Sequence, residues 1–289
     1  MHHWFSGLLG FLATALSAAG GTLAFFHTTV GDVEVELFDQ DKPVTVGNFI
    51  GLVREGAYAN TFFHRCVPGF VVQGGGFSVA NAASAAVFTE YSYVPNFGPI
   101  ANEFAVGPRV SNTTGTIAMA KLGNDPNSAT SQFFFNLADN GGPPASLDAQ
   151  NGGFTVFGRV VRGLEALKTF NTRAANDGVI DLRKIYGTNQ YTSAFSEVPV
   201  QFAGLAPPAY NELVYAGIAL LSVQVRVANA TAHVTWNSVK DKPNRVETSA
   251  TLPPVWQTLL TTNGNGQVLT IEDKNAGGSA KFYRVRVDF

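Results

Sequence analysis

The chain has 289 residues, of which 45% are hydrophobic and 12% aromatic, enough apolar bulk for one large or two ordinary folded domains. Its formal net charge of −2 comes from 19 basic and 21 acidic residues without a basic run, which excludes nucleic-acid binding through a phosphate-neutralising patch. A single cysteine excludes an internal disulfide and a cysteine-based metal cluster. The carboxylates are scattered without ligand spacing, so we expect no metal site.

The N-terminal residues, Trp4 to Ala19, form an apolar stretch that ends in the small residues Ser17-Ala18-Ala19. This pattern is typical of a signal peptide with its cleavage site, which we assign to residues 1–20. The stretch is shorter than the about 20 residues of a membrane span. His2 and His3 stand where a signal peptide usually carries Lys or Arg. The alternatives are a misassigned start and an apolar arm packed on the following domain.

The next segment predicts two strands and a helix. Residues 23–26 form a short apolar run, and Val33, Val35 and Leu37 alternate with acidic residues as in a half-buried strand. An apolar stripe then follows Pro43 at helical spacing, and proline suits the first turn of a helix. Gly56 is placed to end this helix in the left-handed conformation.

The stretch from Phe62 to Phe77 carries one arginine, Arg65, in an apolar run that favours β structure. The dipeptide Pro68-Gly69 predicts a turn between two short strands. Simple alternation places Phe70 and Val72 on one face of the second strand, with Val71 and Gln73 on the other. Gly74 to Gly76 then allow a sharp change of chain direction.

The following residues predict a long surface excursion, more strands and a short helix. The excursion covers residues 78–99, which lack a clear period. We predict strands at residues 115–121, 131–137 and 154–160, a helix at residues 163–170, and a strand at residues 212–220 that closes the fold. Residues 187–208 have the composition of a loop, within which 198–200 can form an edge pairing.

The last part of the chain has a different sequence pattern. From Val223 onward short alternating runs are separated by turn-like segments such as residues 241–244, 263–266 and 276–278. Such spacing is typical of a small all-β sandwich. It resembles the fibronectin-like modules appended to secreted bacterial proteins, and we assign it to residues 223–289.

Three ordered stretches resemble the cyclophilins, the cyclosporin-binding class of peptidyl-prolyl cis-trans isomerases. They are Phe62 to Phe77, Gly115 to Asn140, and Ser146-Leu147-Asp148 followed by Phe154 to Gly158. The resemblance implies a mainly β fold for residues 21–222, a closed eight-stranded β-barrel capped by two helices. The small all-β, sandwich-like domain follows it.

The resemblance also implies the activity and its residues. Rotation about a peptide bond crosses a barrier of about 18–20 kcal/mol, and uncatalysed prolyl isomerisation takes about 10–100 s. Its catalysis requires an apolar socket, a hydrogen-bond donor and backbone anchors, but no cofactor. Arg65 matches the catalytic arginine, whose guanidinium donates to the prolyl nitrogen. The positions that match substrate-binding residues are Phe70, Val71, Gln73, Ala120, Lys121, Gln132, Phe134, Leu147 and Phe154.

This sequence departs from the family pattern at three pocket positions. Val71 replaces a common methionine, Ser146 replaces a tryptophan that contacts cyclosporin, and Phe154 replaces a histidine. We therefore expect isomerase activity to be retained and cyclosporin to bind weakly. From the N-terminal stretch we expect a periplasmic or secreted bacterial protein without a stable membrane span. From the resemblance we expect a monomer whose partners are proline-containing peptides and unfolded polypeptide clients. Such a protein would assist the folding of exported proteins. The alternative is a catalytically weak, cyclophilin-like peptide-binding module at the cell surface.

Overall fold

The computed structural model describes residues 22–187, 193–238, 243–265, 267–276 and 280–287. The chain forms two compact units, one ending at Ser222 and one beginning at Val223. The predicted signal peptide lies outside the described residues. Within those ranges, no helix is both long and apolar enough to cross a membrane.

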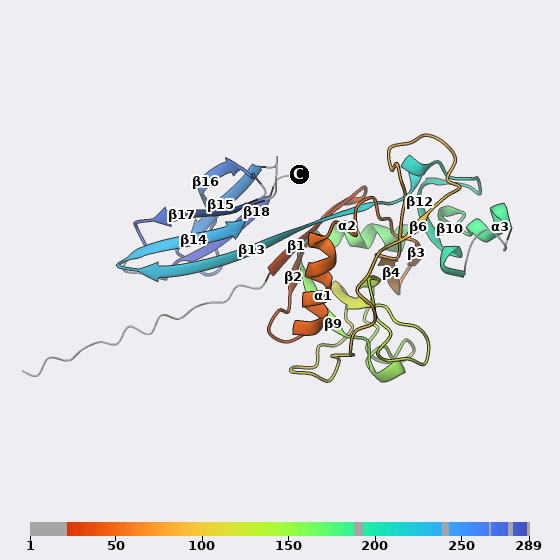
Figure 1. Cartoon of the computed structure of the whole chain (residues 1–289), viewed down its shortest axis with the longest axis horizontal. Helices are drawn as coiled ribbons and strands as arrows, with labels where there is room; N and C mark the ends of the chain where they lie inside the picture. Colours follow the sequence, from red (N-terminus) through yellow and green to blue (C-terminus); the bar gives the residue numbers. More distant parts are fainter. Residues whose placement is uncertain (1–21, 188–192, 239–242, 266, 277–279, 288–289) are drawn as a thin grey trace, which may run out of the picture. The chain divides into compact units, whose positions relative to one another are not determined.

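The first unit is built on eight antiparallel strands in the order β13-β1-β2-β9-β7-β8-β4-β3. Figure 1 shows β1 between β2 and the first part of β13. Their bounds are β1 Thr22–Thr28, β2 Gly31–Leu37, β3 Arg65–Val67, β4 Val71–Gly74, β7 Thr116–Met119, β8 Phe133–Asn136, β9 Val156–Arg162 and β13 Ala216–Ala228. Hydrogen bonds between the segments just before β3 and β13 link the two edges of this sheet. The amide of Phe63 donates to the carbonyl of Val214 at 2.9 Å, and the amide of Ala216 donates to that of Thr61 at 3.1 Å. The prediction of an eight-stranded barrel is confirmed.

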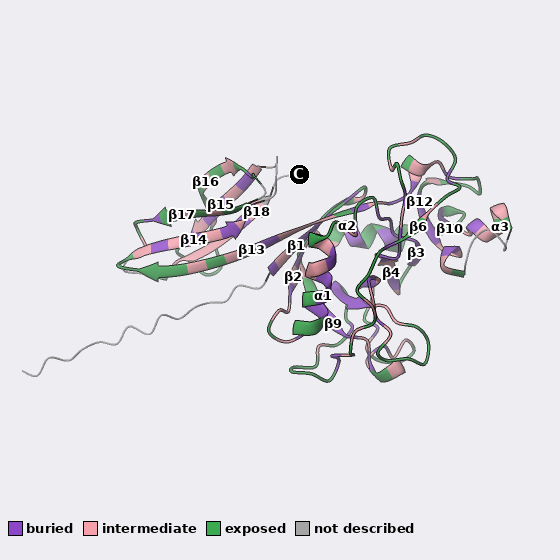
Figure 2. Ribbon diagram, viewed as in Figure 1, coloured by how far each residue is buried: buried purple, intermediate pink, exposed green. Residues whose placement is uncertain are grey.

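Aromatic rings fill the barrel because alternate strand residues point inward. The ring of Phe26 lies edge-on to Phe133 and Phe135, with centroids 5.5 Å and 5.1 Å apart. Helix α1, Pro43–Arg54, adds Phe49 to the same core, and the short helix α2, Leu164–Lys168, adds a leucine. Figure 2 shows that α1 keeps an exposed face opposite its buried one. Gly56 follows α1 with φ of 71°, as its predicted capping role requires.

A second core lies outside the barrel, and the sequence did not predict it. The elements that contribute residues to it are β5 Phe77–Ser78, β11 Asp177–Ile180, α3 Leu182–Tyr186 and β12 Val198–Ala203. Two exposed strands, β6 Ser92–Tyr93 and β10 Ala174–Ala175, pair with β5 and β11. Four 3-10 turns connect elements of this unit: Gln150–Gly152, Thr169–Thr172, Ser193–Phe195 and Tyr210–Glu212. The predicted surface excursion is wrong in part, since Val79 and Phe88 are buried against Phe195 and its neighbours. Widely spaced aromatic residues anchor this segment, so no regular period marks it.

The predicted closing strand begins later and runs further than expected. Leu213 and Tyr215 form isolated bridges rather than a strand, and β13 begins at Ala216 and continues to Ala228. It pairs with β1 over residues 216–222 and with β14 over residues 223–228. Strand β13 therefore runs without a break through Val223, where the composition of the chain changes.

The second unit consists of two three-stranded arrays, one completed by the last residues of β13. The remaining strands are β14 Thr231–Asn237, β15 Pro243–Ser249, β16 Gln257–Asn263, β17 Val268–Asp273 and β18 Phe282–Val287. β14 lies between β13 and β17, and β15 lies between β16 and β18. The buried Trp236 of β14 donates from Nε1 to Oδ1 of Asn244 in β15 at 3.3 Å, joining the two arrays. The small all-β domain has the sandwich-like layering that its spacing indicates.

Candidate active site

A row of directly opposite residues crosses five strands on the outer face of the barrel. The row consists of Arg65, Gln73, Phe134, Ala118 and Val156, each opposite the next. Opposite residues in antiparallel strands project to the same face. The adjacent row, of Cys66, Val72, Phe135 and Ile117, is buried in the barrel core. Strand register therefore fixes Arg65 on the outer face, in line with apolar residues.

These outer-face residues belong to a compact apolar cluster that is separate from the barrel core. Its buried members are Val71, Ala118, Phe134, Leu147 and Val156, and its half-buried rim includes Phe70, Ala120 and Phe154. The structure thus brings together six of the nine predicted substrate-binding residues. The predicted face of Phe70 is wrong: β4 begins only at Val71, so strand alternation does not reach Phe70, which packs with Val71.

Two further predicted residues, Gln73 and Gln132, form an amide pair beside Arg65. Nε2 of Gln73 donates to Oε1 of Gln132 at 2.8 Å. A Cβ on Gly76 would lie 2.8 Å from Cδ of Gln132, so glycine there leaves room for this side chain. Gly75 has φ of 75°, in the left-handed region that glycine adopts without strain. The glycine run therefore both turns the chain and admits the glutamine.

The loop that carries Leu147 is fixed by hydrogen bonds on both sides. The amide of Leu147 donates to the backbone carbonyl of Asn140 at 2.9 Å. The carbonyl of Leu147 accepts from the amide of Phe154, also at 2.9 Å. The carboxylate of Asp148 accepts from Ser111 Oγ at 2.5 Å and from the amide of Asn112 at 2.9 Å. Burial acts to raise the pKa of Asp148, but these hydrogen bonds outweigh it and lower the pKa. Leu147 is therefore held against the apolar cluster by an ionised anchor.

Lys121, the ninth predicted residue, braces the rim of the cluster. Its Nζ donates to the carbonyls of Asn151 and Gly153 at 2.8 Å and 2.7 Å, and lies 4.6 Å from the centroid of the Phe154 ring. Burial lowers the pKa of Lys121 to about 8. These contacts hold the side chain on the loop, so the backbone of Lys121 is the part that remains to line a channel.

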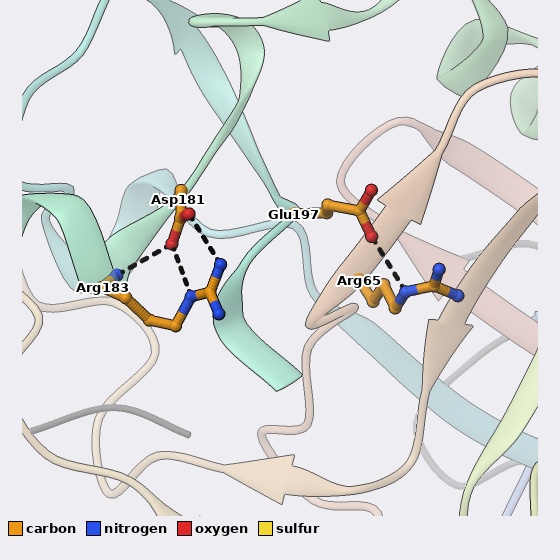
Figure 3. A network of polar contacts seen from close by, with 4 residues as sticks. All are labelled: Arg65, Asp181, Arg183 and Glu197. Carbon is orange, nitrogen blue, oxygen red and sulfur yellow. Dashed lines mark hydrogen bonds and ion pairs between the residues drawn. The ribbon is translucent and has the colours of Figure 1, made fainter. Parts of the chain in front are cut away.

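Arg65 has a partner that the sequence did not reveal. Its Nε donates to Oε2 of Glu197 at 2.9 Å, and both side chains are about one-third exposed, at 32% and 38% (Figure 3). Glu197 lies in the stretch 187–208, whose composition indicated only a loop. It belongs to no motif, so sequence reasoning had no signal for it.

The neighbours of Arg65 along β3 contribute no nucleophile. Cys66 is buried, and burial raises the pKa of its thiol to about 12. Burial lowers the pKa of His64 to about 3, so the ring is neutral; it packs edge-on to Phe77 at 4.8 Å. Cys66 is therefore a structural residue.

Strand register thus places a guanidinium-bearing residue on the same outer face of the barrel as a compact apolar cluster. The chain belongs to the cyclophilin-type peptidyl-prolyl cis-trans isomerases. The family model for the cyclophilin type peptidyl-prolyl cis-trans isomerase/CLD matches residues 23–188. The chain is therefore an isomerase of X-Pro bonds.

Several relatives are similar to this chain over about half of its length. A peptidyl-prolyl cis-trans isomerase of Acinetobacter baylyi is 38% identical over 162 residues, which cover 55% of this chain and 77% of the relative. Peptidyl-prolyl cis-trans isomerase A of Dickeya dadantii is 42% identical over 153 residues, covering 52% and 72%. A crystal structure of a Cryptosporidium parvum cyclophilin-type isomerase, obtained in the presence of the dipeptide ala-pro, is 26% identical with a TM-score of 0.39 and covers 53% of this chain and 87% of that one.

Proposed function

We propose that Arg65 is the catalytic donor of this isomerase and that the outer-face apolar cluster is the socket for the substrate proline. The observation that carries this proposal is the cross-strand row, in which strand register places Arg65 on the same face as Phe134. The socket holds the pyrrolidine ring by apolar burial, at roughly 25 cal/mol per Å² removed from water. Gln73 and Gln132 present amides that can anchor the substrate backbone beside it.

The chemistry of this arrangement is the weakening of amide resonance. When the X-Pro bond twists, the prolyl nitrogen becomes pyramidal and its lone pair is free to accept a hydrogen bond. A guanidinium donates such a bond without losing its charge at any working pH. The bond is strongest in the twisted state, so it lowers the barrier rather than only binding the substrate. No covalent intermediate and no proton transfer are needed.

Replacing Phe134 by Ala tests the socket. Phe134 is buried in the cluster, whereas the flanking Phe133 and Phe135 belong to the barrel core. We expect kcat/KM on an Ala-Pro-Phe peptide to fall about tenfold or more, because the lost ring removes about 1–3 kcal/mol of contact with the proline. A protease-coupled assay measures it. Phe134→Leu, which keeps apolar bulk, should retain more activity; equal activity of wild type and Phe134→Ala would contradict the socket.

We propose further that the protein acts in an exported location, periplasmic or secreted, and assists the folding of exported proteins. The apolar stretch from Trp4 to Ala19 with its small-residue end supports this location. We expect expression of the full chain in a bacterium to yield an exported protein lacking about 20 N-terminal residues, measured by cell fractionation and intact mass. A full-length protein that stays in the cytoplasm would contradict the proposal.

A further inference from the structure

We propose that Glu197 is a positioning residue that orients the guanidinium of Arg65 for catalysis. This inference rests on the proposed catalytic role of Arg65. Glu197 lies beyond the residues 23–188 that the family model matches, in a segment that folds back onto the barrel. Glu197 therefore adds to the site a residue that the matched family region does not contain.

The backbone at Glu197 is fixed from both sides. Phe195 and Val198 are fully buried in the second core, and the Phe195 ring lies 4.6 Å from Phe77. The carbonyl of Glu197 itself accepts from the amide of Cys66 at 2.7 Å, on the free edge of β3. A carboxylate on such a rigid segment can hold its partner in one place, because its own backbone has little freedom left.

The contact leaves the reactive part of the guanidinium available. Glu197 accepts from Nε of Arg65, as Figure 3 shows. Within the described ranges, no other protein group accepts a hydrogen bond from this guanidinium. Gln73 lies directly opposite Arg65 but donates its amide to Gln132. Glu197 is thus the group that restrains the long side chain of Arg65, so that rotamer freedom is lost before the reaction rather than during it.

The nearby arginine does not share this role. The Nε and Nη2 atoms of Arg183 both donate to Asp181, each at 2.9 Å, and Figure 3 shows that pair beside the Glu197–Arg65 pair. With Arg183 held by its own carboxylate, Glu197 is directed to Arg65. The Glu197 carboxylate also acts on Arg183 through its charge, which helps to raise the pKa of that guanidinium after the larger effect of Asp181, but its hydrogen bond is with Arg65.

The test compares Glu197→Ala and Glu197→Gln with the wild type and with Arg65→Ala. We expect Glu197→Ala to lower kcat/KM about fivefold, the size of a partly exposed ion pair. The loss should lie in the catalysed exchange rate, with the peptide Kd from NMR titration unchanged. Glu197→Gln, which keeps an acceptor, should lose less.

A matched control is Glu36→Gln. Glu36 accepts from Nε of Arg159 at 2.9 Å, and Nη2 of Arg159 lies 2.8 Å from the same oxygen, so this pair joins β2 and β9 without a residue of the proposed site. It should leave both the exchange rate and the peptide Kd unchanged. An NMR readout is the Nε–H resonance of Arg65. In Glu197→Ala, but not in Glu36→Gln, its chemical shift should change and its proton should exchange faster with solvent.

The outcomes distinguish a failure of the role proposed for Glu197 from a failure of the catalytic role proposed for Arg65. An inactive Arg65→Ala together with a fully active or faster Glu197→Ala overturns the role of Glu197 and leaves Arg65 as the donor. A loss in Glu197→Ala that persists in the Arg65→Ala background, or that appears as weaker peptide binding, also overturns positioning. Full activity of Arg65→Ala overturns the catalytic assignment itself, and the role of Glu197 with it.

Discussion

Arg65→Ala is expected to lower kcat/KM on an Ala-Pro-Phe peptide by about 10²–10³, the cost of removing one donor that acts on the transition state. The fold should persist, because the β3 ladder uses backbone groups and a partly exposed ion pair contributes about 0–1 kcal/mol to the free energy of unfolding. The measurement is an NMR-exchange or protease-coupled assay, with a thermal melt of the same samples.

Arg65→Lys is the control that separates charge from geometry. An ammonium is a point charge on a flexible stem, so it cannot bind Glu197 through one nitrogen while two others in the same plane face the substrate. We expect Arg65→Lys to remain close to Arg65→Ala in activity. Recovery of most of the wild-type kcat/KM in the lysine variant would show that a positive charge alone suffices and would contradict donation by an oriented guanidinium.

Single strands of the barrel were predictable from sequence because their pattern is local, whereas their arrangement as an eight-stranded barrel was an implication of the resemblance to cyclophilins. Alternation at Val33, Val35 and Leu37 sets one strand, and the glycine and proline positions around β3 and β4 set their turn. The same rule failed at Phe70, since alternation holds only inside a strand and β4 begins one residue later. The error is small in sequence but moves a large ring from the core to the outer face.

The second core and Glu197 could not be predicted because their contacts are distant in sequence. Phe77, Phe88 and Phe195 meet across more than a hundred residues, and none of them stands in a periodic run. Glu197 reaches Arg65 across a separation of 132 residues. Composition indicates a loop in such segments, and only the packing of their isolated aromatic residues fixes their path.

Trp236→Ala is expected to unfold the second unit. The Trp236 side chain is 1% exposed, and its removal leaves a cavity and takes away the Nε1 donor to Asn244, at a cost of about 3–5 kcal/mol. A unit of this size has little stability to lose. Hydrogen exchange followed by mass spectrometry should show lost protection in β14 and β15.

Trp256→Ala is the matched control, since Trp256 is only half-buried and packs on the guanidinium of Arg284 at 4.3 Å. Such a contact contributes about 0.5–1 kcal/mol, so this variant should keep its exchange protection. Because every residue of the proposed site belongs to the first unit, Trp236→Ala should retain the wild-type kcat/KM. If Trp236→Ala instead lost protection in the barrel strands and its activity together, the two units would form one cooperative structure, joined through the shared strand β13.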